Sequence, residues 1–214
     1  MSGDAGAAQE RTGGLGLYFL LGLPAFYRWS QILVWRNSGL RFFNDFAAPK
    51  SGERVLDIGC GPGDRLLTLP AVDYTGFDLD RGYIEAAQRR HGTRGRFFCA
   101  DVSAVDLSAE KGSFDLILAG GVLHHVDDER AAKMFALAHG LLKEGGRFVT
   151  VDPCYVREQS AMSRWVVSRD RGRFVRAREH YLRLAGANFS KVFDTVRHNL
   201  LRVPYTQILL RCVK

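Results

Sequence analysis

The stretch from Arg54 to Asp64, which reads RVLDIGCGPGD, constrains the fold of this chain most strongly. Its first half carries Val55, Leu56 and Ile58, the bulky apolar residues that are typical of a strand buried in a parallel sheet. Three glycines follow within five residues. Glycine accepts a positive φ and has no Cβ, so the backbone can turn sharply and approach a ligand closely. A buried strand, a glycine turn and a helix predict the ligand-binding start of a doubly wound α/β sheet.

The acids around the glycine turn indicate the kind of ligand. A dinucleotide fingerprint reads G-x-G-x-x-G, but Asp64 stands where the third glycine would follow Gly59. Asp57 precedes the turn, and carboxylates on both sides of it would repel a phosphate. No Walker lysine follows the turn. The pattern favours a cationic ligand without phosphate. S-adenosylmethionine has this character because it is a sulfonium that also carries an ammonium group.

Two further acids stand at the ends of predicted strands. Residues 72–77 are expected to form a strand that ends at Asp78, and residues 95–100 a strand that is followed by Asp101. An acid about 20 positions beyond the glycine turn can accept hydrogen bonds from ribose hydroxyls, and Asp78 stands there. For Asp101, a turn or helix cap is the alternative role. Together with Asp57, three acids at three strand ends predict one site.

With these elements in order, the chain resembles the class I methyltransferases that depend on S-adenosylmethionine. Residues 55–64 read like the first motif of that family, and the L-L-K-x-G-G run at 141–146 is similar to a later one. The resemblance covers about residues 55–153. It implies a single α/β domain with a doubly wound, mostly parallel, seven-stranded Rossmann-like sheet and helices on both faces. It also implies S-adenosylmethionine as cofactor and S-adenosylhomocysteine as product.

In the family, the acid after the third strand accepts from the adenine amino group, and its neighbour packs on the adenine ring. We therefore predict cofactor contacts at the glycine turn, at the strand ends and at one tyrosine of the N-terminal segment. Core packing is the alternative for that tyrosine, as it is for Tyr18. The predicted cofactor-binding residues are Tyr27, Asp57, Gly59, Cys60, Gly61, Gly63, Asp78, Leu79, Asp101, Val102 and Gly120.

Two adjacent histidines, His124 and His125, follow the predicted fourth strand at residues 113–120. The resemblance places acceptor-facing residues in this loop. The pKa of histidine lies near neutral pH, so we predict both as catalytic, with one of them acting as a general base. Capping and packing roles are the alternative. No third ligand with suitable spacing lies nearby, so no metal site is predicted.

The chain has a formal net charge of +7, and much of it lies near the C-terminal end. Residues 157–183 contain eight arginines and three acids. A solvated face, an anion-binding pocket and nucleic-acid binding are the three interpretations. Arginine matches carboxylate and phosphate groups with two parallel hydrogen bonds. We predict that Arg169, Arg171 and Arg173 bind a small acceptor that bears such a group.

Nucleic-acid partners are not expected. The chain contains no recognisable RNA module, and residues 119–122 read AGGV where DNA methyltransferases carry an Asn-Pro-Pro-Tyr type of clamp. We divide the chain into a flexible N-terminus (1–14), a helical lid (15–48) and a core (49–214) with a basic helical insertion at about 155–186. A helix on a membrane surface is the alternative for the amphipathic part of the lid.

The uncharged run at residues 15–27 is too short to span a bilayer, so no stable membrane insertion is expected. The four cysteines lack C-x-x-C spacing, which indicates packed thiols in a reducing compartment and predicts a cytoplasmic protein.

These observations predict an enzyme that moves the sulfonium methyl group to an O or N atom of a small, anionic metabolite by in-line displacement. Alignment of donor and acceptor can supply roughly 7–11 kcal/mol of the barrier. One alternative is a non-catalytic or RNA-associated protein that binds S-adenosylmethionine. The other is an oxidoreductase with a nucleotide cofactor, which Asp64 disfavours.

Overall fold

The computed structural model describes residues 37–201 and 203–214. Its centre is a sheet with the strand order β3-β2-β1-β4-β5-β8-β7, in which the two-residue strand β6 also pairs with β5. Strands β1 to β5 pair in parallel, whereas β8 is antiparallel to both β5 and β7. The predicted doubly wound, mostly parallel sheet is confirmed. The strands are β1 (Arg54–Ile58), β2 (Asp73–Asp78), β3 (Gly95–Cys99), β4 (Phe114–Gly120), β5 (Leu142–Tyr155), β6 (Arg176–Ala177), β7 (Lys191–Arg197) and β8 (Gln207–Val213).

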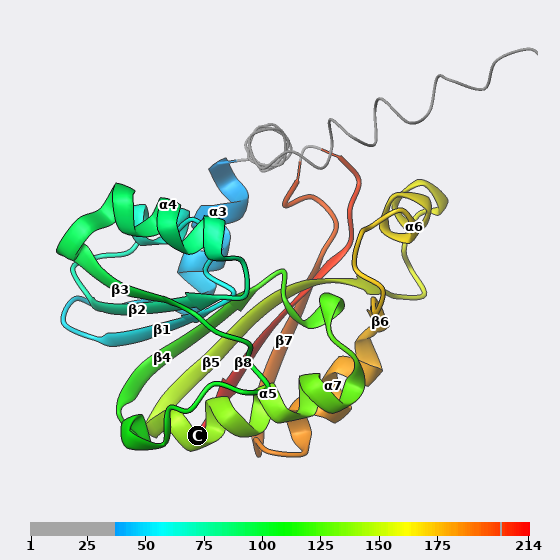
Figure 1. Ribbon diagram of the computed structural model, residues 1–214. Coiled ribbons are helices and arrows are strands. Elements are labelled where there is room, and N and C mark those ends of the chain that lie inside the picture. Colours follow the sequence, from blue (N-terminus) through cyan, green and yellow to red (C-terminus); the bar gives the residue numbers. More distant parts are fainter. Residues whose placement is uncertain (1–36, 202) are drawn as a thin grey trace, which may run out of the picture.

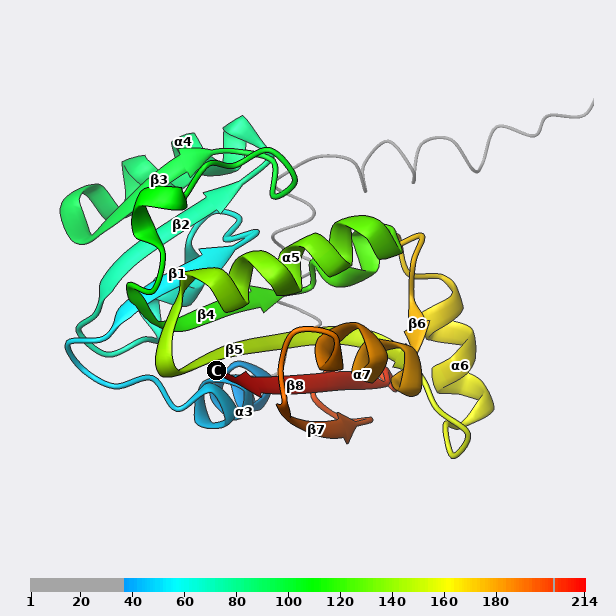
Figure 2. The same ribbon diagram turned by 90° about the horizontal axis from the view of Figure 1, so that it is seen from below.

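Helices cover both faces of the sheet. In Figure 1, α3 and α4 lie above the sheet, and α5 and α7 lie below it. Figure 2 looks onto the α5 and α7 face. The longer helices are α3 (Asn37–Ala47), α4 (Arg81–His91), α5 (Asp128–Leu141), α6 (Ala161–Ser168) and α7 (Arg178–Gly186). None of these, within the part of the chain that the structure describes, has the length and apolar character needed to cross a bilayer.

The central strand β4 shows why the sheet is covered on both sides. Leu116 and Leu118 belong to the apolar cluster beneath α3 and α4. Ile117 and Ala119 belong to the cluster beneath α5 and α7. Successive side chains of a strand point to opposite faces, so a continuous apolar run requires a layer of helices on each face.

Helix α3 is the described part of the predicted lid. Phe43 and Ala47 are buried against the sheet. Arg147 on β5 donates through Nε to the Ala47 carbonyl at 2.6 Å, and its guanidinium pairs with Glu53 at 2.9 Å. Residues 1–36, which include Tyr18 and Tyr27, lie outside the described ranges. The limits of the lid, core and insertion stay predictions.

The insertion follows β5 and contains α6, β6 and α7. Helix α6 lies beyond the carboxyl end of β5, at the edge of the molecule remote from α4 (Figure 1). A small cluster of Val167, Leu201 and Tyr205 packs beneath this helix. Helices α6 and α7 lie within the range of the basic helical insertion predicted at about residues 155–186.

Candidate active site

A cavity of about 540 Å³ opens at the carboxyl ends of the parallel strands. It lies where the strand order reverses between β1 and β4, the position at which open α/β sheets bind ligands. Its walls come from the glycine turn after β1, the end of β2, the segment after β3 and the segment after β4. Eight of the predicted cofactor residues line it: Gly59, Cys60, Gly61, Asp78, Leu79, Asp101, Val102 and Gly120.

The glycine turn is shaped by close backbone approach. Gly59 has φ +68°, and a Cβ at this position would lie 2.5 Å from Cγ2 of Val122. The amides of Gly59 and Cys60 both donate to the Phe77 carbonyl, at 2.9 and 3.0 Å. The turn is therefore attached to the end of β2, and Gly59 is required both by its conformation and by its neighbour.

Asp78 is held by the backbone at the cavity wall. Its Oδ2 accepts from the Gly61 amide and its Oδ1 from the Asp80 amide, both at 2.9 Å. Each carboxylate oxygen can accept a further hydrogen bond. Asp78 is thus oriented by the backbone and keeps the capacity to accept hydrogen bonds from a ligand.

Asp101 also lines the cavity while it performs the alternative turn role. Its Oδ1 accepts from the Ser103 amide at 2.7 Å and from the Ser103 hydroxyl at 2.6 Å. These hydrogen bonds lower the pKa of Asp101, so the carboxylate is ionised at neutral pH. A carboxylate in this state accepts hydrogen bonds only, as an amino group of a ligand requires.

Two predicted cofactor residues do not line the cavity. Asp57 is only 1% exposed and accepts from the Tyr74 hydroxyl at 2.8 Å. Gly63 packs elsewhere: a Cβ there would lie 2.9 Å from the ring of His91 and 3.1 Å from that of Phe97. Gly63 therefore permits close packing of α4 and β3, which spacing within the glycine turn could not reveal.

Arg65 lines the cavity and was missed by the sequence analysis. Its Nε lies 3.5 Å from Oδ2 of Asp57, and its guanidinium lies 4.5 Å from the ring centre of Phe43. A Cβ at Gly120 would lie 2.1 Å from Nη2 of Arg65, so a larger residue there would displace the guanidinium from its present position. The one sequence signal was a basic residue directly after the turn.

Nη1 of Arg65 and Oδ1 of Asp57 are among the buried polar atoms that meet no partner within residues 37–201 and 203–214. Such atoms carry an energetic cost unless something hydrogen-bonds to them. Burial raises the pKa of Asp57, while the nearby Arg65 cation and the Tyr74 hydrogen bond oppose this. Because Arg65 lines the cavity and Asp57 does not, the arrangement leaves a cationic donor that suits a ligand with a carboxylate.

His124 does not line the cavity and is buried, with 6% of its surface exposed. Its Nδ1 lies 2.8 Å from Oδ1 of Asp152, and its Nε2 lies 3.3 Å from Oδ1 of Asp170. Burial lowers the pKa of His124, but the hydrogen bonds to the two carboxylates outweigh it and raise the pKa to about 9. At neutral pH this side chain is a cation with both N–H groups engaged. This arrangement argues against the predicted role of His124 as a general base, because a base needs a free lone pair.

His125 lines the cavity, and its ring centre lies 4.0 Å from that of His124. Burial and the neighbouring His124 cation both lower the pKa of His125. It is therefore neutral at physiological pH and has a lone pair with which to accept a proton. Of the two histidines predicted as catalytic, His125 is the one that the structure brings to the cavity.

The arginines predicted to bind the acceptor do not line the cavity. Arg169, Arg171 and Arg173 are exposed on the loop after α6, and the Arg169 guanidinium lies 5.2 Å from the ring centre of Trp165. A different arginine of the described chain, Arg130, lines the cavity.

Arg176 supports the segment that carries the histidines. It is 5% exposed and donates to the carbonyls of Leu123 and Val126, each at 2.7 Å, and to Oδ1 of Asp128 at 2.8 Å. Residues 123–125 form a short 3-10 turn between these carbonyls. Arg176 thus fixes the position of His125 without reaching the cavity.

The comparisons with known proteins agree with this geometry. Residues 55–146 match a sequence family described as methyltransferase domain. The chain is 32% identical over 119 residues to phthiotriol/phenolphthiotriol dimycocerosates methyltransferase 1 of Mycobacterium ulcerans. This match covers 54% of this chain and 42% of that protein. The chain is also 30% identical over 96 residues to malonyl-[acyl-carrier protein] O-methyltransferase of Legionella pneumophila, and this match covers 42% of this chain and 34% of that protein. The matched part spans less than two thirds of these relatives.

Solved structures share the fold. A TehB-like methyltransferase from Corynebacterium glutamicum has a TM-score of 0.61 at 21% identity, with 84% of this chain and 89% of that chain covered. The PH0226 protein from Pyrococcus horikoshii has a TM-score of 0.67 at 16% identity, with 92% and 99% covered. The sheet and its switch-point cavity define the class I, Rossmann-like methyltransferase fold. Residues 55–146 match the methyltransferase domain family, and over this part of the chain the resemblance inferred from the glycine turn is confirmed.

Proposed function

We propose that this protein transfers the methyl group of S-adenosylmethionine to an O or N atom of a small molecule that bears an acidic group. The observation that carries the proposal is the set of charges around one cavity, where Asp78, Asp101 and Arg65 face a common space. A carboxylate, a ribose and an adenine would each find a partner there. Phosphates would instead meet the carboxylates of Asp64 and Asp78.

The residues present fit this cofactor, and each has a distinct task. Asp78 would accept from the ribose hydroxyls, and Asp101 from the adenine amino group, beside Val102. Arg65 would bind the carboxylate of the amino-acid part, and the buried Asp57 would hold Arg65 in place. When bound, S-adenosylmethionine supplies a methyl group that its sulfonium already activates. The protein then has to position the acceptor and remove its proton.

His125 is the base that we assign to proton removal. It lines the cavity in the neutral state, and the turn that carries it is fixed by Arg176. The acidic group of the acceptor is proposed because Arg130 lines the same cavity and the chain is basic. Exclusion of water and alignment of the two reactants would supply the remaining part of the rate enhancement. A screen of metabolite mixtures with methyl-labelled S-adenosylmethionine would detect the acceptor as a labelled product.

S-adenosylhomocysteine is expected to raise the thermal unfolding temperature of the protein, while NAD and NADP leave it unchanged. Ligand binding to the folded state alone stabilises it by mass action, by roughly 2.7 kcal/mol at a hundredfold excess over Kd. A thermal-shift titration of the full chain measures this. Stabilisation by NAD without stabilisation by S-adenosylhomocysteine would reverse the assignment in favour of the oxidoreductase.

Asp78→Ala is expected to weaken S-adenosylhomocysteine binding about 10- to 100-fold, because a hydrogen bond to a charged group is worth roughly 1.5–3 kcal/mol. Calorimetric titration measures the change in Kd. Asp78→Asn keeps the size of the side chain and one side-chain oxygen that can accept from a backbone amide. This variant therefore separates the ribose contact from support of the turn. Asp73→Ala at the opposite end of β2 is the matched control, since Asp73 is exposed and pairs only with Arg54 among the described residues. Unchanged affinity in both Asp78 variants would assign the ribose to another group.

A further inference from the structure

Helix α6 exposes large apolar side chains at the edge of the molecule. Met162 is 65% exposed and Trp165 is 59% exposed. The two residues are three positions apart, so they lie on the same side of the helix. The opposite side is buried through Ser163 and Val167, which pack toward the core. Phe174, on the loop that follows, is also exposed. Exposed apolar groups that gather in one place indicate an interaction site.

The same surface is strongly cationic. We call Met162, Arg164, Trp165, Arg169, Arg171 and Arg173 the α6 surface, and all six side chains are exposed. Residues 157–174 contain five arginines and two acids. One of those acids, Asp170, is directed inward, where it accepts from the Tyr205 hydroxyl and the Gly172 amide and pairs with His124. The surface therefore presents positive charge beside its apolar side chains.

The loop that carries these arginines packs against the buried His124. A Cβ at Gly172 would lie 2.0 Å from the His124 ring, and the Phe174 amide donates to the His124 carbonyl at 3.0 Å. Arg169 lies over Trp165, and Arg164 lies 5.5 Å from the ring centre of Tyr155. A surface that is ordered before binding loses less conformational freedom when it docks.

We propose that the α6 surface docks peripherally on an anionic membrane surface. Tryptophan favours the boundary between water and hydrocarbon, and arginine side chains are attracted to anionic lipid headgroups. Because α6 lies beyond the carboxyl end of β5, docking would bring the cavity-bearing edge of the sheet toward the lipid (Figure 1). The proposal goes beyond the methyl-transfer function, and its test does not depend on methyl transfer.

Two other occupants fit the surface less well. Residues 1–36 contain the uncharged run 15–27, which would match the apolar side chains, but their only acids are Asp4 and Glu10. A single-stranded nucleic acid would stack on Trp165 and neutralise the arginines, but it offers no apolar environment for Met162. An anionic lipid surface satisfies the charges and the apolar side chains together.

The test is flotation of the full chain with vesicles of phosphatidylcholine alone and with vesicles that contain about one third phosphatidylserine. Binding to the anionic vesicles only is expected, and it should weaken as salt rises. Each arginine near such a surface contributes about fivefold in affinity. The variant with Arg169→Gln, Arg171→Gln and Arg173→Gln should therefore bind at least tenfold more weakly. Met162→Ser with Trp165→Ala should also reduce binding, including the part that persists at high salt.

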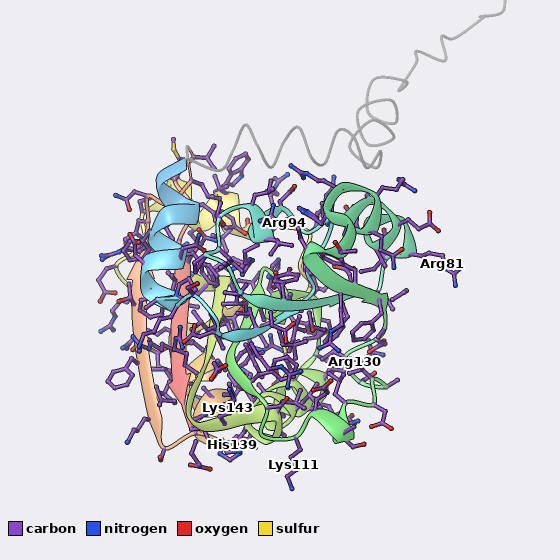
Figure 3. All side chains as sticks on the ribbon, turned by 90° about the vertical axis from the view of Figure 1, so that its left-hand side faces the viewer. Arg81, Arg94, Lys111, Arg130, His139 and Lys143 are labelled. Atoms are coloured by element: carbon purple, nitrogen blue, oxygen red, sulfur yellow. The ribbon has the colours of Figure 1, made fainter. Side chains whose placement is uncertain are left out.

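The matched control changes the same number of charges on the opposite edge, with Arg81→Gln, Arg89→Gln and Arg94→Gln. Figure 3 views this edge and labels Arg81 and Arg94. The control should bind vesicles like the unaltered chain. Equal binding to both kinds of vesicle, no binding, or binding that neither α6 variant reduces would overturn the proposal. Loss of single-stranded RNA binding, with vesicle binding intact, would assign the surface to nucleic acid.

A fluorescence measurement tests whether another part of the chain, such as residues 1–36, covers the α6 surface. In a variant with Trp29→Phe and Trp35→Phe, Trp165 is the single tryptophan of the chain. We expect its emission to be quenched by acrylamide in solution and to become protected and shifted to the blue when anionic vesicles are added. Protection in the absence of vesicles would show that another part of the chain covers the α6 surface, which would overturn the proposal.

Discussion

His124→Ala is expected to lower the free energy of unfolding by about 3–5 kcal/mol, because it removes the cation shared by the buried Asp152 and the partly buried Asp170. Asp152 is only 1% exposed, and Asp170 is tied to the same imidazole. Urea unfolding followed by circular dichroism measures the change. His180→Ala is the matched control: His180 lies 2.9 Å from the exposed Asp128, and an ion pair in contact with solvent contributes at most about 1 kcal/mol.

The contact of His124 with the two carboxylates also predicts how the free energy of unfolding depends on pH. The pKa of His124 is about 9 in the folded protein, above its ordinary value of 6.5. Its contribution to stability is therefore fully present below pH 6.5 and is lost as the pH rises through 9. Each unit of pKa shift corresponds to about 1.4 kcal/mol, so the loss amounts to about 3 kcal/mol. The unaltered chain and His124→Ala should converge in stability at alkaline pH. Parallel curves would contradict the assignment of a buried imidazolium.

His125→Gln is expected to lower kcat about 10²- to 10⁴-fold, the range that a positioned general base contributes, without changing the affinity for S-adenosylhomocysteine. The assay measures initial rates with labelled S-adenosylmethionine and the acceptor found by screening. Because only neutral imidazole accepts a proton, activity should fall as the pH drops through the lowered pKa of His125.

His139→Gln is the control for this substitution. His139 lies on α5, 5.1 Å from the ring centre of Phe189, and does not line the cavity (Figure 3). This variant should retain the kcat of the unaltered chain. If His125→Gln retains it as well, the acceptor reaches the cavity already deprotonated and the base is not needed.

The two histidines illustrate a limit of sequence analysis. They are adjacent in one motif, and the pattern treated both as catalytic. In the structure, one imidazole points inward to Asp152 at the end region of β5 and to Asp170 after α6, while the other borders the cavity. The difference in their pKa values comes from those carboxylates, which belong to distant parts of the chain. No local pattern contains that information.

The arginines show the same limit. The density of arginines in the sequence predicted one shared role, but the fold distributes these arginines among different roles. Arg176 is buried against main-chain carbonyls, and Arg178 forms two hydrogen bonds with Asp194, at 2.6 and 2.8 Å. Arg169 is exposed beside Trp165. Charge counts cannot distinguish these tasks, because a guanidinium is placed by the acceptors that the fold brings to it.

The sequence by itself determined what depends on neighbours along the chain. Apolar runs predicted the parallel strands, and the glycine turn predicted the ligand-binding end of the sheet. The N-cap of α4 is also local, since Asp80 accepts from the Tyr83 amide three residues later at 3.1 Å. Only the tertiary structure decided which charged residues reach the cavity, placing Asp78 and Arg65 at its wall and Asp57 beneath it. Strand pairing and burial set these positions, and both depend on residues far apart in the sequence.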